Sequence, residues 1–201
     1  ARSQTRDPAE RAAGSPPGTA LAGYENSGRA ESSAALKAAA GGGFAPRPAG
    51  AWQNRILAMS AARLHRSGPQ LAGAPITVSL LPALTVSRGK LLSGASCGEP
   101  VHAGSFIRER RIVLDSELTR HPRELRRILA HELCHFAWVR LGNPLRRSWE
   151  NLLAAEMRRR AKGELGWSAG LRKLRLDAGD VRLRTRRWRA YAVESFCDTG
   201  A

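Results

Sequence analysis

Apolar residues recur at helical spacing in four stretches of the chain, and each stretch predicts a helix. The four helices are expected over Trp52 to Leu64, Pro122 to Val139, Ser148 to about Ala161, and the C-terminal part from about Arg186. The second is the strongest, because a proline stands at its first position and Gly142 follows its end. Ser148 is the expected N-cap of the third.

Short runs with many β-branched residues lie between the first two helices. They predict strands over Ile76–Leu81, Leu84–Val86 and Arg111–Asp115, whereas the segment from Gly89 to Pro100 is rich in turn residues. Strands and helices together predict an α+β protein.

The first 50 residues have a different composition. They hold 14 Ala, 8 Gly, 5 Pro and 5 Ser, which is 32 of 50 positions. A segment of this kind cannot bury enough apolar surface to offset the loss of chain entropy on folding. We therefore expect a disordered tail over residues 1–50, with at most a short helix around Glu31–Ala40, and one folded domain over residues 51–201.

The 201-residue chain is strongly basic, with a formal net charge of +16, and 42% of its residues are hydrophobic. Such a hydrophobic content allows a sizeable core, and no apolar run is long enough to cross a bilayer. The N-terminal stretch shows no secretory signal. Three cysteines without paired spacing, Cys97, Cys134 and Cys197, fit a reducing compartment. These features predict a cytoplasmic protein.

One motif in the strongest helix points to metal chemistry. Residues 131–135 read His131-Glu132-Leu133-Cys134-His135, an H-E-x-x-H sequence. Residues four apart share one face of a helix, so both imidazoles can bind one zinc ion. Glu132 can then act as the general base on a water molecule.

The position of Glu132 on the helix strengthens this interpretation. Glu132 lies within the apolar stripe of the helix, and the two histidines border that stripe. A carboxylate is costly to bury there unless a cation is close. The alternative is that Glu132 pairs with an arginine and the histidines are core residues with satisfied hydrogen bonds. The stripe itself comprises Leu125, Ile128, Leu129, Phe136 and Val139.

A catalytic zinc ion usually has a third protein ligand, and no histidine follows His135. The downstream carboxylates that remain are Glu150, Glu156, Glu164, Asp177, Asp180, Glu194 and Asp198. We favour Glu194, because Asp198 lies four residues later on the same helix face and can orient a ligand histidine. Glu156 is the rival ligand, and Glu194 could instead be an exposed acid that balances nearby arginines.

H-E-x-x-H followed by a helix that carries E-x-x-x-D resembles the gluzincin group of zincin metallopeptidases. The resemblance covers roughly residues 52–201. It implies that His131, His135 and Glu194 bind zinc, that Glu132 is the general base and that Asp198 orients a histidine. It also implies a zincin-like fold, in which a small mixed sheet packs on the active-site helix and an edge strand lies near Arg111–Leu114.

Other residues have weaker claims to a function. His102 or Tyr191 could stabilise an oxyanion. Cys134 could face the metal, but it is expected to be a small apolar residue of its helix, and Cys197 is interpreted in the same way. The stretch Leu171–Arg189 carries eight basic residues between Trp167 and Trp188, and it is either a solvated face or a nucleic-acid surface. The eight are residues 172, 173, 175, 182, 184, 186, 187 and 189.

Two functions therefore remain open at the level of sequence. The first is a zinc-dependent metallopeptidase that acts on a peptide or protein substrate. The second is a basic nucleic-acid-associated protein whose zinc site is structural or inactive. Glu132 discriminates between them, because a structural zinc site needs no acid between its two histidines.

Overall fold

The fold comes from a computed structural model of the 201-residue chain. It describes residues 18–20, 44–46, 50–68, 71–94, 98–163 and 166–201. Two three-residue strands, β1 (Gly18–Ala20) and β2 (Phe44–Pro46), fall within the segment predicted to be a disordered tail, and both pair with the sheet. The helix expected around Glu31–Ala40 and Cys97 lie outside the described residues.

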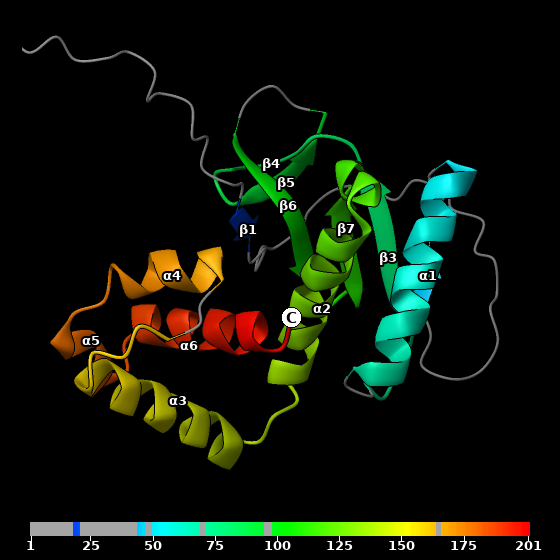
Figure 1. The fold of residues 1–201 in the computed structure, drawn as a ribbon. Helices are drawn as coiled ribbons and strands as arrows, with labels where there is room; N and C mark the ends of the chain where they lie inside the picture. The colour runs from blue at the N-terminus through cyan, green and yellow to red at the C-terminus, as the bar shows by residue number, and fades with distance from the viewer. Residues whose placement is uncertain (1–17, 21–43, 47–49, 69–70, 95–97, 164–165) are drawn as a thin grey trace, which may run out of the picture.

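The strands form one mixed sheet with the order β2-β3-β7-β6-β4-β5, and β1 pairs with β6 (Figure 1). Pairing is parallel for β1 with β6, β2 with β3 and β3 with β7, and antiparallel for the remaining neighbours. The five strands of the main segment are β3 (Ile76–Leu81), β4 (Leu84–Ser87), β5 (Lys90–Ser93), β6 (Glu99–Phe106) and β7 (Arg111–Asp115).

The helices form two groups that share α2. Helices α1 and α2 pack on the sheet, whereas α3, α4, α5 and α6 gather on the other side of α2 (Figure 1). No described helix is long and apolar enough to cross a membrane. The helices are α1 (Ala51–Ser67), the 3-10 helix η1 (Ser116–Arg120), α2 (Pro122–Trp138), α3 (Asn143–Arg158), α4 (Trp167–Lys173), α5 (Ala178–Leu183) and α6 (Arg186–Thr199).

The α+β class is confirmed, as are the helices predicted from the spacing of apolar residues and the three predicted strands. Helix α3 begins earlier than predicted, at Asn143, with Gly142 as its N-cap and Pro144 in its first turn, so Ser148 is inside the helix and does not cap it. Backbone N–H groups in the first turn of a helix have no partner within the helix, so proline, which lacks this group, fits there. The segment Gly89 to Pro100, predicted to be rich in turns, contains β5 and the first two residues of β6.

The edge strand implied near Arg111–Leu114 is wrong, because β7 lies inside the sheet between β3 and β6. This strand is paired along both edges and also covered on both faces, because Ile112, Val113 and Leu114 are all almost fully buried. The run of β-branched residues that predicted this strand is therefore typical of a strand inside the sheet.

The apolar residues divide into two main cores on opposite sides of α2. The first fills the space between the sheet, α1 and α2, and the second joins the end of α2 to α3, α4 and α6. Four of the five stripe residues of α2 lie in the first core, but Val139 is 47% exposed just beyond the helix end. Chief members of the second core are Trp138, Leu153, Ala169, Trp188, Tyr191 and Ala192.

One buried carboxylate joins three elements of the sheet region. Asp115 lies at the end of β7 and accepts two backbone hydrogen bonds. Leu84 N, at the start of β4, donates one at 2.9 Å, and Glu117 N, in η1, donates the other at 2.9 Å. We expect Asp115→Ala to lower the free energy of unfolding by about 2–4 kcal/mol, because two backbone donors lose their acceptor. Asp115→Asn keeps one side-chain oxygen and should lose less. Urea denaturation measures both, and equal losses would contradict the double role of the carboxylate.

Candidate metal centre

The H-E-x-x-H motif lies at the point where α2 is covered on both sides. Helix α2 packs against β6 on one side and against α6 on the other. As a result His131, Glu132 and His135 are 1%, 0% and 3% exposed. Groups this polar remain buried only where partners compensate for the water they have lost.

His131 is oriented by a carboxylate from α6. Its Nδ1 lies 2.8 Å from Asp198 Oδ1, and the other oxygen of Asp198 accepts a hydrogen bond from Ala169 N at 3.2 Å. This pair fixes the ring so that Nε2 points toward Glu194, where it has no hydrogen-bond partner within the described residues. A ligand histidine in a zinc protein typically shows this arrangement, with one ring nitrogen on a carboxylate and the other facing the ion.

Glu194 lies beside the free nitrogen of His131. Its Oε2 is 3.5 Å from His131 Nε2 and accepts a hydrogen bond from the Ser168 hydroxyl at 2.6 Å, while Arg172 approaches Oε1 at 3.4 Å. Burial alone would raise the pKa of Glu194, but the two histidines, Arg172 and Ser168 outweigh it and hold this pKa at about 2. The carboxylate is therefore ionised and ready to bind a cation.

The two histidines have opposite proton affinities. Burial disfavours the charged form of His131, but the carboxylates of Asp198 and Glu194 prevail and raise its pKa to about 10. Burial lowers the pKa of His135 to about 4, so this imidazole is neutral at pH 7. A positive charge at this place is therefore favoured by the surrounding carboxylates, and in a metal complex the ion supplies it.

Cys197, which the sequence analysis interpreted as an apolar residue of its helix, lies among these donors. Its Sγ lies 3.3 Å from His135 Nδ1, and His131, His135 and Cys197 form a fully buried group that could hold a metal ion. Cys134 and Cys197 are both free thiols. The signal available in the sequence was the spacing, since residue 197 lies three after Glu194 and shares its helix face.

Glu132 is held by a serine from the sheet. Ser105 on β6 donates a hydrogen bond to Glu132 Oε2 at 2.5 Å, whereas Oε1 is buried with no partner among the described residues. Burial is the main reason that the pKa of Glu132 rises to about 7, although His131 and Ser105 act against it. Nothing in the sequence singled out Ser105, because the irregular pattern around Pro100 and Gly104 concealed the strand that carries it.

The remaining candidates are not brought to this point. Glu156, the rival ligand on α3, is half-buried, whereas Glu194 is fully buried 3.5 Å from His131 Nε2. Tyr191 packs against Trp188 in the second core with a ring-centroid distance of 5.6 Å. His102 on β6 is half-buried near Asp115, Glu124 and Arg127, and its burial lowers its pKa.

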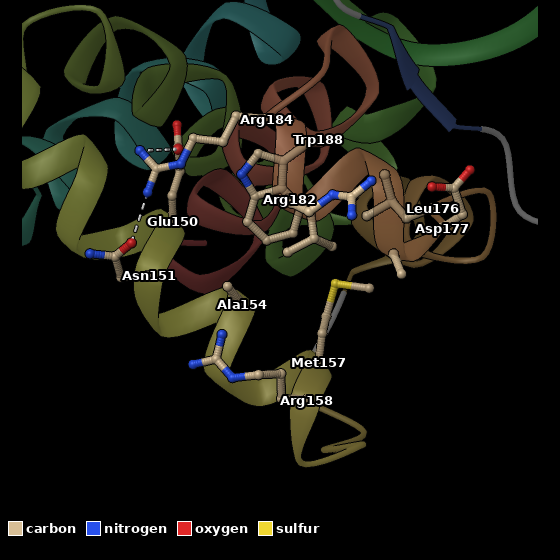
Figure 2. A pocket seen from close by; sticks show the side chains of 12 residues that line it. Glu150, Asn151, Ala154, Met157, Arg158, Leu176, Asp177, Arg182, Arg184 and Trp188 are labelled. Atoms are coloured by element: carbon tan, nitrogen blue, oxygen red, sulfur yellow. Dashed lines mark hydrogen bonds and ion pairs between the residues drawn. The ribbon is translucent and has the colours of Figure 1, made fainter.

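The basic stretch 171–189 does not form one continuous face. Arg172 turns inward to Ser168 and Glu194, and Lys173 binds the carbonyl of Ala161. Arg184 pairs with Glu150 and Asn151 at one end of a separate hollow of about 660 Å³ between α3, α5 and α6 (Figure 2). The hollow has an apolar floor and contains none of the motif residues. Its apolar lining consists of Ala154, Met157, Leu176, Ala178, Val181 and Trp188.

Comparison with known proteins gives no matching family model, no matching curated protein and no matching solved structure. The case for a function therefore depends on the geometry of the site.

A glycine permits the contact between Asp198 and His131. A Cβ atom on Gly166, the N-cap of α4, would overlap the Asp198 carboxylate, whereas a Cβ on Gly170 in the same helix meets nothing within 4 Å. We expect Gly166→Ala to displace Asp198 and weaken binding of a metal ion by about 10- to 100-fold, the usual effect of losing a partner of a ligand histidine. Gly170→Ala should leave metal affinity unchanged and stabilise the helix by up to about 1 kcal/mol. Competition with a chromophoric chelator measures the metal affinity of both variants, and equal affinities would contradict the role of Gly166.

The raised pKa of Glu132 predicts a pH-dependent stability in the metal-free protein. Between pH 4.5 and about 7 the folded state keeps a proton that the unfolded state has lost, so ionisation of Glu132 destabilises the fold as pH rises through this window. Glu132→Gln removes the ionisation. The free energy of unfolding of this variant should exceed that of the wild type by an amount that grows to about 3 kcal/mol over this window and stays constant above pH 7.

Urea denaturation in the presence of a chelator, from pH 4 to 8, measures this difference. Glu156→Gln, which removes a carboxylate outside the donor group, is the control for the loss of one charge. An advantage of Glu132→Gln that does not change with pH would show that Glu132 titrates normally.

Proposed function

We propose that the protein is a zinc-dependent metallopeptidase with a zincin-like arrangement of its site, acting on a peptide or protein substrate in the cytoplasm. The observation that carries the proposal is the buried carboxylate of Glu132 between two histidines that share one helix face. Burial makes this carboxylate costly, and a site that only held a metal would not need it.

The donor set suits zinc. His131, His135 and Glu194 would hold the ion, since imidazole and carboxylate are both zinc ligands and His131 Nε2 is a buried nitrogen that no described residue hydrogen-bonds. The 3.5 Å between His131 Nε2 and Glu194 Oε2 is too long for a good hydrogen bond and close to the roughly 3.4 Å that separates two ligands of one tetrahedral ion. A zinc ion in this position would acidify a water molecule and polarise the carbonyl of the substrate.

The protein's own residues would then move the proton. Glu132 accepts a proton from the attacking water at Oε1, the oxygen without a partner in the described part of the chain, while Ser105 holds Oε2. Burial raises the pKa of Glu132 in the metal-free site, so this carboxylate is suited to take up the proton and pass it to the leaving amine. Asp198 keeps His131 in the orientation that ligation needs.

One observation favours the alternative, a basic nucleic-acid-associated protein with a structural or inactive zinc site. All the donors are at most 3% exposed, so a peptide could reach them only after the site opens. Exposed arginines at 175, 182, 186, 187 and 189 supply the positive surface that such a protein needs.

Glu132→Gln tests the proposal. Zinc content, measured by mass spectrometry, should stay at about one ion per chain, whereas hydrolysis of casein should fall by about 10²- to 10⁴-fold because the proton acceptor is lost. His131→Ala should lose the metal, and Glu156→Gln should keep both metal and activity. The alternative is favoured if neither the zinc-loaded wild type nor a variant without Cys197 cleaves casein, and if the protein binds DNA with a steep salt dependence.

A further inference from the structure

Cys197 is placed among the metal donors by two helices. Helix α6 carries Glu194, Cys197 and Asp198 at spacings of three and four residues, so all three side chains face α2. Cys197 is fully buried, and its sulfur and one ring nitrogen of each histidine lie within 4.8 Å of one another. The described structure therefore places four donors together, two from α2 and two from α6.

The distances within this group match those of ligands on a common ion. Bond lengths of about 2.3 Å for zinc–sulfur and about 2.0–2.1 Å for zinc–nitrogen, at the tetrahedral angle, separate sulfur and nitrogen by about 3.5 Å. The Cys197 Sγ to His135 Nδ1 distance is 3.3 Å. Together with the His131–Glu194 separation of 3.5 Å, it makes two pairs that each fit one tetrahedral centre.

The surroundings of His131 give a second, independent observation that points to a cation within this group. Its Nε2 is buried and has no hydrogen-bond partner among the described residues, although its other nitrogen is firmly bound to Asp198. An unpartnered buried nitrogen next to a carboxylate and a thiol is costly unless a cation lies between them. One ion would satisfy all these groups at once.

We propose that the thiolate of Cys197 is the fourth ligand of the metal, in the coordination position that the attacking water needs. The inference rests on the proposed function, because it assumes the same ion on His131, His135 and Glu194. A set of two imidazoles, one carboxylate and one thiolate takes Zn²⁺, Co²⁺ or Cd²⁺ in preference to Mg²⁺ or Ca²⁺. Four protein ligands close the site, so the folded form is a latent enzyme whose activity requires release of the sulfur.

Cobalt substitution tests the ligation directly. The protein is loaded with Co²⁺, and its near-ultraviolet and visible absorption is recorded for the wild type and for Cys97→Ser, Cys134→Ser and Cys197→Ser. Ligation by Cys197 predicts a sulfur-to-cobalt charge-transfer band in the wild type and in the first two variants, and its loss in Cys197→Ser. The buried Cys134 is the matched control, because it lies on α2 between the two histidines.

The outcomes separate this inference from the proposed function. If the wild type binds no Co²⁺ at all, the metallopeptidase proposal itself fails. If Co²⁺ binds and the wild type shows no thiolate band, or if Cys97→Ser or Cys134→Ser removes the band, the inference is wrong and the proposed function stands. In that case Cys197 only orients His135 through an S–H···N hydrogen bond.

Activity gives a second readout that does not depend on the spectrum. Cys197→Ala should vacate one coordination position, keep the metal on the other three ligands and raise the rate of casein hydrolysis by roughly tenfold or more. Adding Glu132→Gln to this variant should abolish the gain. A Cys197→Ala protein that retains its metal and cleaves no faster than the wild type would overturn the latency.

Discussion

Burial of α2 on both sides is the constraint on which the rest of the site depends. The helix has the sheet on one side and α6 on the other, so its two histidines and Glu132 have almost no contact with water. Each of these groups needs a partner from another element. Ser105 provides one from β6, and Asp198, Glu194 and Cys197 provide the others from α6.

Helix α6 is in turn positioned by α4, a short helix with no obvious sequence signal. Ser168 and Arg172 contact Glu194, and the backbone N–H of Ala169 binds Asp198. These contacts keep the Glu194 carboxylate ionised and hold both carboxylates in their orientation before any ion arrives. Preorganisation of this kind raises metal affinity because little ordering remains to be done on binding.

The sequence predicted the parts of the site that depend on local spacing. His131, Glu132 and His135 follow from the H-E-x-x-H pattern, and Glu194 with Asp198 follows from their separation by four on a helix. It did not predict β6, because Pro100, Gly104 and several small residues interrupt the alternation that identifies a strand.

Contacts between distant segments could not be predicted in this way. Ser105 meets Glu132 only because β6 lies inside the sheet against α2, and Cys197 meets His135 only because α6 crosses α2. Cys197 was expected to be an apolar residue, as most buried cysteines are. The inward orientation of Arg172 likewise depends on α4, a short helix that the sequence analysis did not predict.

The shared position of α2 also bears on how the protein folds. Phe136 belongs to the first core and Trp138, two residues later, belongs to the second. Loss of α2 therefore exposes apolar surface on both sides, and neither half of the molecule keeps a complete interior without it. The two halves are expected to unfold as one cooperative unit, with the amide hydrogens of α2 among the slowest in the chain to exchange with solvent.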